Sequence, residues 1–62
     1  MMMTMYYVHG IGPSKDCHVN FPALSPQAAY DVFKQEMGEK VTVAEIRPLF
    51  TFDYEEKRLV TN

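Results

Sequence analysis

The sequence predicts a single small α+β domain in which one helix packs on one face of a small antiparallel sheet. Three observations support this fold class. Residues 17–21 alternate apolar and polar side chains with the period of a half-buried strand. Residues 26–37 carry the start and stop signals of a helix, and residues 41–47 are rich in β-branched types. The order of elements is therefore β-β-α-β, with an optional fourth strand at the C-terminal end, and residues 1–62 form one domain.

The first two strands are expected to pair as an antiparallel hairpin. Residues 3–9 are rich in aromatic and β-branched types and contain neither glycine nor proline, which predicts a strand. Residues 10–16 hold two glycines and a proline, so we expect a long loop there. Glycines followed by Lys15 resemble a phosphate-binding loop, but such a loop opens directly into a helix, and here a strand follows. Pro22 is expected to end the second strand.

The helix has the clearest boundaries of any element. Ser25 is a good N-cap because its hydroxyl can accept a hydrogen bond from an early helical N–H. Pro26 occupies the first helical position, where a missing N–H costs nothing, and Gly38 supplies a left-handed residue after the helix. Four apolar side chains fall on one stripe and are expected to be buried against the sheet: Ala29, Val32, Phe33 and Met37.

The segment after the helix is expected to be extended. Residues 41–47 form a third strand, which Pro48 either ends or places on an edge of the sheet, because proline donates no ladder hydrogen bond. Residues 49–54 continue as an extended segment with three aromatic side chains on one side. A turn is expected at residues 55–57, and residues 58–61 are either a short fourth strand or a frayed end.

Composition limits the kinds of function that the chain can have. A chain of 62 residues buries only about 60% of its unfolded surface, so a domain of this size needs additional stabilisation. Cys17 is the only cysteine, which excludes an internal disulfide and indicates a reducing compartment, so we expect a cytoplasmic protein. The net charge of −2 argues against direct binding of nucleic acid, and no stretch approaches the length of a membrane span. A protein partner, or a second copy, is left as the natural source of stability.

His9, Cys17 and His18 are the residues whose chemistry best suits metal binding or catalysis. Cys17 and His18 are adjacent in a strand, so their side chains point to opposite faces. Three ligands also fall short of the four of a closed zinc site, and a domain this small has little volume for a substrate pocket. We therefore expect no metal ligands, no cofactor and no catalytic residues. A small enzyme or metal protein built on these three residues is kept as a third interpretation.

The aromatic side chains are the most informative feature for function. One helix with a short apolar stripe cannot cover all eight of them, so Tyr6, Tyr7, Tyr30 and at least one of the later rings should stay partly exposed. Exposed aromatic patches on a small domain usually mark an interface. Glu45 and Arg47 share a face of the third strand, and arginine is favoured at interfaces. The residues expected to bind a partner are Glu45, Arg47, Phe50, Phe52 and Tyr54.

Part of the chain resembles the small phage-encoded inhibitors of bacterial RNA polymerase. In that family an extended segment leads into an alanine-containing helix and then into a strand that ends in Arg-Pro. The matching stretches here are residues 19–21, 28–33 and 41–48, of which the last ends in Arg47-Pro48. The resemblance implies that Arg47 grips the polymerase. The residue two positions before this arginine is basic in the family, whereas here it is Glu45, which alters the local charge.

Two interpretations of function follow, and both are binding rather than catalysis. In the first, a compact phage-type protein binds and inhibits or modulates a host protein complex in the host cytoplasm. It does so through the third strand and the aromatic segment after it, and the resemblance implies RNA polymerase as the target. In the second, the chain is a homodimer, a structural or assembly module that pairs edge strands and buries its surplus aromatic side chains in its own interface.

Overall fold

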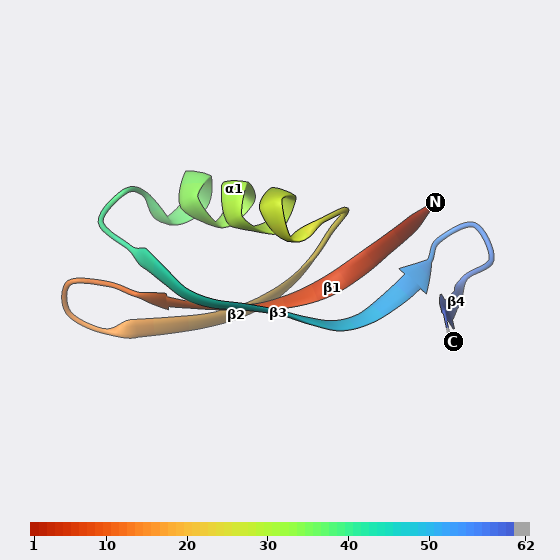
Figure 1. The fold of residues 1–62 in the computed structure, drawn as a ribbon, viewed down its shortest axis with the longest axis horizontal. Helices are drawn as coiled ribbons and strands as arrows, with labels where there is room; N and C mark the ends of the chain where they lie inside the picture. Colours follow the sequence, from red (N-terminus) through yellow and green to blue (C-terminus); the bar gives the residue numbers. More distant parts are fainter. Residues whose placement is uncertain (61–62) are drawn as a thin grey trace.

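The fold is one helix on a four-stranded antiparallel sheet, as Figure 1 shows. The structure, a computed structural model, describes residues 1–60. Its elements are β1 (Met2–Ile11), β2 (Asp16–Ala23), α1 (Pro26–Met37), β3 (Thr42–Asp53) and β4 (Arg58–Val60). The sheet order is β2-β1-β3-β4, and every neighbouring pair is antiparallel. The predicted α+β class is therefore confirmed, with the fourth strand present. The expected last residue of that strand, Thr61, lies outside the described residues.

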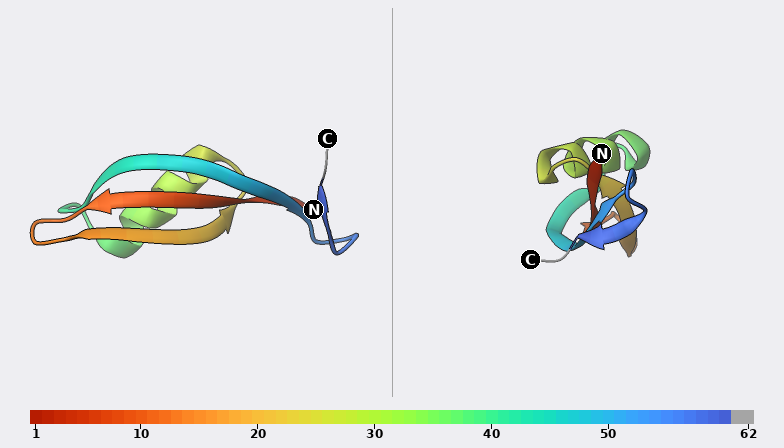
Figure 2. Two further views of the ribbon diagram at one scale, coloured as in Figure 1. Left: turned by 90° about the horizontal axis from the view of Figure 1, so that it is seen from below. Right: turned by 90° about the vertical axis from the view of Figure 1, so that its right-hand side faces the viewer.

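The molecule is elongated, with principal extents of 41 × 17 × 14 Å. Helix α1 lies over one half of the sheet only. Past the N-terminal end of the helix, the start of β1 and the end of β3 continue as a twisted ribbon that carries β4 (Figures 1 and 2). We call this part, residues 1–5 and 49–60, the arm. No helix among residues 1–60 is long and apolar enough to cross a membrane.

Helix α1 begins and ends where its capping residues predict. The Ser25 hydroxyl accepts a hydrogen bond from the Ala28 N–H at 3.1 Å, which satisfies one of the free donors of the first turn. Gly38 follows the last helical residue with φ 88°, a left-handed value that glycine adopts without strain, and its N–H donates to the Lys34 carbonyl at 2.8 Å. The Lys34 ammonium in turn donates to the Val41 carbonyl at 2.6 Å, which ties the helix end to the start of β3.

The core under the helix is small. Its buried members are Tyr6, Val8, Ala23, Ala29 and Phe33. Of the four stripe residues expected to be buried, Ala29 and Phe33 are, whereas Val32 is 44% exposed and Met37 41% exposed. The helix rests on the sheet along the line from Ala29 to Phe33, so side chains to one side of that line overhang the edge strand β2. The prediction of a fully buried stripe was wrong because a three-turn helix contacts a narrow sheet along one line only.

Several boundaries also differ from expectation. Gly10 belongs to β1, and the loop between β1 and β2 is only residues 12–15, closed by a hydrogen bond from the Gly12 N–H to the Lys15 carbonyl at 3.0 Å. Pro22 does not end β2 but pairs with Met5 inside it. A proline is tolerated there because β2 is an edge strand, whose outer N–H groups have no neighbour to bond. For Pro48 the edge alternative holds, because it lies within β3 at a point where β4 does not yet pair with that strand.

Two irregularities in the β1–β3 ladder decide which side chains share a face. Met5 pairs with Phe50 but Tyr6 pairs with Pro48, so the residue between them on β3 has no partner. A second shift lies between His9 and Gly10. Each extra residue is a β-bulge, which resets the alternation of the strand that contains it. As a result of the first shift, the odd-numbered residues Glu45 and Arg47 share a face of the sheet with the even-numbered residues Phe50 and Phe52.

Candidate functional site

The sheet face opposite α1, here called the open face, has no layer over it in the described chain. Its central part carries polar or aromatic side chains from three strands, and six of them form one contacting group. In the ladder, Tyr7 pairs with Arg47 and His9 pairs with both His18 and Glu45, and directly paired residues project to the same face. Asp16 lies two positions before His18 on β2 and therefore projects to the same face. The six side chains are Tyr7, His9, Asp16, His18, Glu45 and Arg47.

The two histidines are in direct contact across the hairpin. Their rings stack with centroids 4.4 Å apart and planes 12° from parallel. His9 Nε2 lies 2.9 Å from Oδ2 of Asp16, and His18 Nδ1 lies 2.7 Å from the hydroxyl of Tyr7. Each imidazole is therefore held by a different hydrogen-bonding neighbour. The group is partly accessible to solvent, with the His9 side chain 23% exposed and that of Asp16 52% exposed.

Arg47 lies against Tyr7 on the same face. Its guanidinium carbon is 5.1 Å from the centroid of the tyrosine ring, a cation–π distance worth about 0.5–1 kcal/mol at an exposed site. The nearest carboxylate contact, from Glu45, is 3.9 Å long between exposed groups and contributes little. The ring therefore positions the guanidinium more than the carboxylate does, and the Arg47 side chain remains 59% exposed.

The aromatic segment joins this surface through the first bulge. Phe50 pairs with Met5 and Phe52 pairs with Met3, and these methionines alternate with Tyr6 along β1. Since Tyr6 points to the helix, the two phenylalanines belong to the open face. Tyr54, just past the strand, packs edge-on against Phe52 with centroids 4.9 Å apart.

The five residues predicted to bind a partner thus lie along one side of β3. Glu45, Arg47, Phe50 and Phe52 are on the open face, and Tyr54 extends the row by its contact with Phe52. Phe50 and Tyr54 are each 45% exposed, as is expected of surplus rings, and Tyr30 is 40% exposed. Tyr6 is a correction, because it is only 5% exposed and belongs to the core. Strand alternation places it toward the helix, so it fills the core that the short apolar stripe of α1 leaves incomplete.

The arm exposes further apolar side chains. Besides Phe50 and Tyr54, they are Met1, Met2, Leu49, Leu59 and Val60, each 38–61% exposed. The helix does not reach this part of the sheet (Figure 1). The arm and the open face together form one long uncovered surface, apolar at one end and polar at the other.

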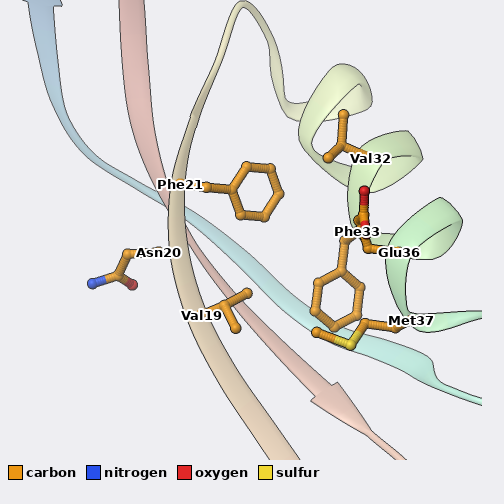
Figure 3. Close-up of a pocket in the computed structure, with 7 residues that line it drawn as sticks. All are labelled: Val19, Asn20, Phe21, Val32, Phe33, Glu36 and Met37. Atoms are coloured by element: carbon orange, nitrogen blue, oxygen red, sulfur yellow. The ribbon is translucent and has the colours of Figure 1, made fainter.

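A groove of about 320 Å³ lies between α1 and β2 (Figure 3). Its lining residues are Val19, Asn20, Phe21, Val32, Phe33, Glu36 and Met37. It exists because Val32 and Met37 overhang the edge strand without closing onto it. Glu36 is its only ionisable group, so the groove offers no pair of groups for acid–base or nucleophilic chemistry.

Cys17 points away from the histidines. It packs against the core on the helix side, whereas His18 is on the open face, as strand alternation predicts. Asp16, and not Cys17, is the third member of the histidine cluster, and sequence reasoning missed it. The signal was the spacing: a four-residue loop at residues 12–15 sets His9 opposite His18 and Asp16 diagonal to His9. An expected loop of residues 10–16 concealed that register.

The chain was compared with protein-family models, with curated proteins and with solved structures, and nothing matches it. The site must therefore be interpreted from its own geometry.

Proposed function

We propose that this chain is a binding protein that inhibits or modulates a host protein complex through the second half of β3 and the residue after it, from Glu45 to Tyr54. The observation that carries the proposal is the row of residues on the open face. An exposed arginine, oriented by Tyr7, stands next to exposed aromatic side chains, and no part of the described chain covers them. Arginine and aromatic residues are the types that most often dominate binding energy at protein interfaces.

Bacterial RNA polymerase is the partner to test first. The resemblance to phage-encoded polymerase inhibitors rests on the helix and on the strand that ends in Arg47-Pro48, and Arg47 is the residue that it assigns to polymerase contact. An exposed guanidinium on an extended strand suits a partner that presents carboxylates, because the planar group can bind a carboxylate through two hydrogen bonds. The partner chemistry we propose is therefore an acidic protein surface with an apolar margin.

The experiment is a binding assay with purified bacterial RNA polymerase, followed by transcription with and without the chain. Arg47→Glu reverses the charge at the proposed contact and should abolish binding and inhibition. Lys40→Glu is the matched control, since it makes the same change of charge at an exposed site beside the helix. Phe50→Ser should weaken binding separately, because it removes an apolar contact without a change of charge. Binding that survives both Arg47→Glu and Phe50→Ser would show that this surface is not the interface.

Self-association is the second candidate function, and the edges of the sheet favour it. Strand β4 pairs with β3 only at residues 51–53, so the outer edge of β3 from Thr42 to Phe50 has free backbone groups. Such edges are templates for pairing with another chain, although Pro48 shortens the usable stretch to residues 42–47. Light scattering coupled to size exclusion decides between the candidates. A monomer at high concentration contradicts the dimer, and a dimer that Phe50→Ser dissociates supports it.

A further inference from the structure

The histidine cluster of the open face brings together side chains that can bind a metal ion, which protein binding does not require. His9, Asp16 and His18 each offer one metal-ligand atom, and these atoms lie within 4.8 Å of one another. The three residues come from the two strands of one hairpin, so their backbone positions are fixed by the β1–β2 ladder. The proposed protein interface uses β3, two strands away from β2, and neither histidine belongs to it.

We propose that His9, Asp16 and His18 form a binding site for a divalent transition-metal ion of the zinc class. Two imidazole nitrogens with one carboxylate oxygen suit zinc, copper, nickel or iron(II), whereas magnesium and calcium prefer all-oxygen ligands. Three protein ligands leave at least one coordination position open to water or to an external group. The site is therefore an open one, of the kind that binds metal reversibly.

The hydrogen bond between Tyr7 and His18 prepares one ligand. When His18 Nδ1–H donates to the Tyr7 oxygen, which lies 2.7 Å away, the lone pair is left on Nε2. Ligating histidines commonly use their second nitrogen in this way, which selects the tautomer that leaves Nε2 free to bind metal. Tyr7 is in turn packed under the Arg47 guanidinium, so its own side chain is restrained.

The short contact between His9 and Asp16 prepares the other two ligands. His9 Nε2–H donates to Asp16 Oδ2 at 2.9 Å, so the metal ion takes the place of this shared proton, which leaves to solvent. Ligands of a tetrahedral zinc ion, each about 2.0–2.1 Å from it, lie roughly 3.4 Å from one another. The ligand atoms of the cluster lie within 4.8 Å of one another, so no separation exceeds the tetrahedral value by more than about 1.4 Å. Rotation of the exposed side chains supplies that movement without any shift of the ladder.

Metal binding requires the two imidazole rings to leave their stacked arrangement. Lone pairs on ring nitrogens lie in the ring planes, and two planes only 12° from parallel do not aim at one point. The rings must therefore turn about their side-chain bonds as the metal enters. This rearrangement distinguishes a chelate from metal held loosely by surface carboxylates, because only the chelate changes both rings together.

The test uses the untagged full chain, whose only histidines are His9 and His18. Zinc chloride is titrated calorimetrically, and the histidine ring signals are followed by NMR in the same titration. We expect one ion per chain and a change in both rings at the same zinc concentration. Cobalt(II) as a second probe should develop visible absorption bands of a site with nitrogen ligands.

Four substitutions and one control locate the site. His9→Gln, His18→Gln and Asp16→Asn should each weaken zinc binding roughly tenfold or more, and Tyr7→Phe should weaken it to a smaller degree through loss of the second hydrogen bond. Asp31→Asn is the matched control, because it makes the same change at an exposed aspartate on the helix. Circular dichroism checks that each variant keeps its fold, as expected for side chains outside the core.

The outcomes separate clearly. Loss of zinc binding in the three ligand variants, with Asp31→Asn unchanged, supports the site. Absence of saturable zinc binding, or binding that His9→Gln and His18→Gln leave intact, overturns it and leaves the cluster as two stacked rings with a hydrogen bond from His9 to Asp16. Neither outcome depends on polymerase binding, since the readout is the metal alone.

Discussion

A Cβ atom on Gly10 would lie 2.5 Å from Cζ and 2.8 Å from Cε2 of the Phe33 ring. Gly10 is the next-to-last residue of β1 and pairs with Val43 of β3, and Phe33 is the largest fully buried side chain of the helix. The glycine is therefore present because the ring occupies the space above the strand. A turn does not require it, since the loop begins two residues later.

Gly10→Ala should destabilise the domain by about 1–3 kcal/mol, the usual cost of inserting a methyl group into a packed core. A glycine in a strand interior normally gains stability on replacement by alanine, so a loss here identifies the close contact with the ring. Urea unfolding followed by circular dichroism measures the change, since the chain has no tryptophan. Phe33→Leu in the same background should restore part of the loss, and full additivity of the two changes would argue against the contact.

Phe33→Ala should cost about 3–5 kcal/mol, which is enough to unfold most of a domain this small. Val32→Ala, one position earlier on the helix, should cost less than about 1 kcal/mol, because Val32 is 44% exposed. Far-ultraviolet circular dichroism and thermal melts of both variants test the pair. Equal losses would mean that α1 rests on the sheet along a different line.

Ser25→Ala should lower the free energy of unfolding by about 1 kcal/mol, because it removes the acceptor for the Ala28 N–H. Ser14→Ala, in the hairpin loop, is the matched control and should change stability by less than about 0.5 kcal/mol. The comparison is made by urea unfolding at one temperature. A loss of the same size in both variants would show that the cap contributes nothing specific.

Lys57→Gly should raise stability by about 0.5–1 kcal/mol. Lys57 has φ 54° in the turn between β3 and β4, and a left-handed backbone costs a residue with a Cβ about 1–2 kcal/mol. Glycine removes this cost, although its greater freedom in the unfolded chain offsets part of the gain. Lys57→Val should move stability in the opposite direction, because a β-branched residue tolerates positive φ poorly. Thermal melts of the three proteins give the order, and valine above lysine would contradict the turn geometry.

Local signals predicted the helix almost to the residue. Three residues set the helix ends: the capping serine, the proline at the first helical position and the glycine after the last one. Each acts within one turn of its helix end, so distant contacts hardly alter the helix boundaries. The half-buried alternation of β2 was equally local. By contrast, Pro22 was misjudged, because the tolerance of a strand for proline depends on which side of it lacks a neighbour, and the sheet order decides that. For Pro48 the sequence left two positions open, the end of the strand or an edge of the sheet, and it lies on an edge.

The candidate sites divide in the same way. The aromatic row from Phe50 to Tyr54 could be identified from composition, because eight rings exceed what one short helix covers. Strand alternation alone would place Arg47 and Phe50, three residues apart, on opposite faces of the sheet. They share a face because of the bulge between them, which the sequence does not reveal. The cluster of His9, Asp16 and His18 depended on a hairpin register that a shift of one residue would have destroyed.

The sequence by itself determined the α+β class, the bounds of the helix, the chain order of the strands and an excess of aromatic side chains. These follow from capping, backbone preference and composition, which act over a few residues or over the whole chain at once. Only the tertiary structure decided which side chains meet. The β1–β3 pairing across 30 or more residues, with its bulges, set Arg47 on Tyr7. The register of the β1–β2 hairpin set two histidines beside one aspartate, and the packing of α1 on the sheet set Phe33 on Gly10. Strand register is a collective property of the packed sheet, so no short stretch of sequence contains it.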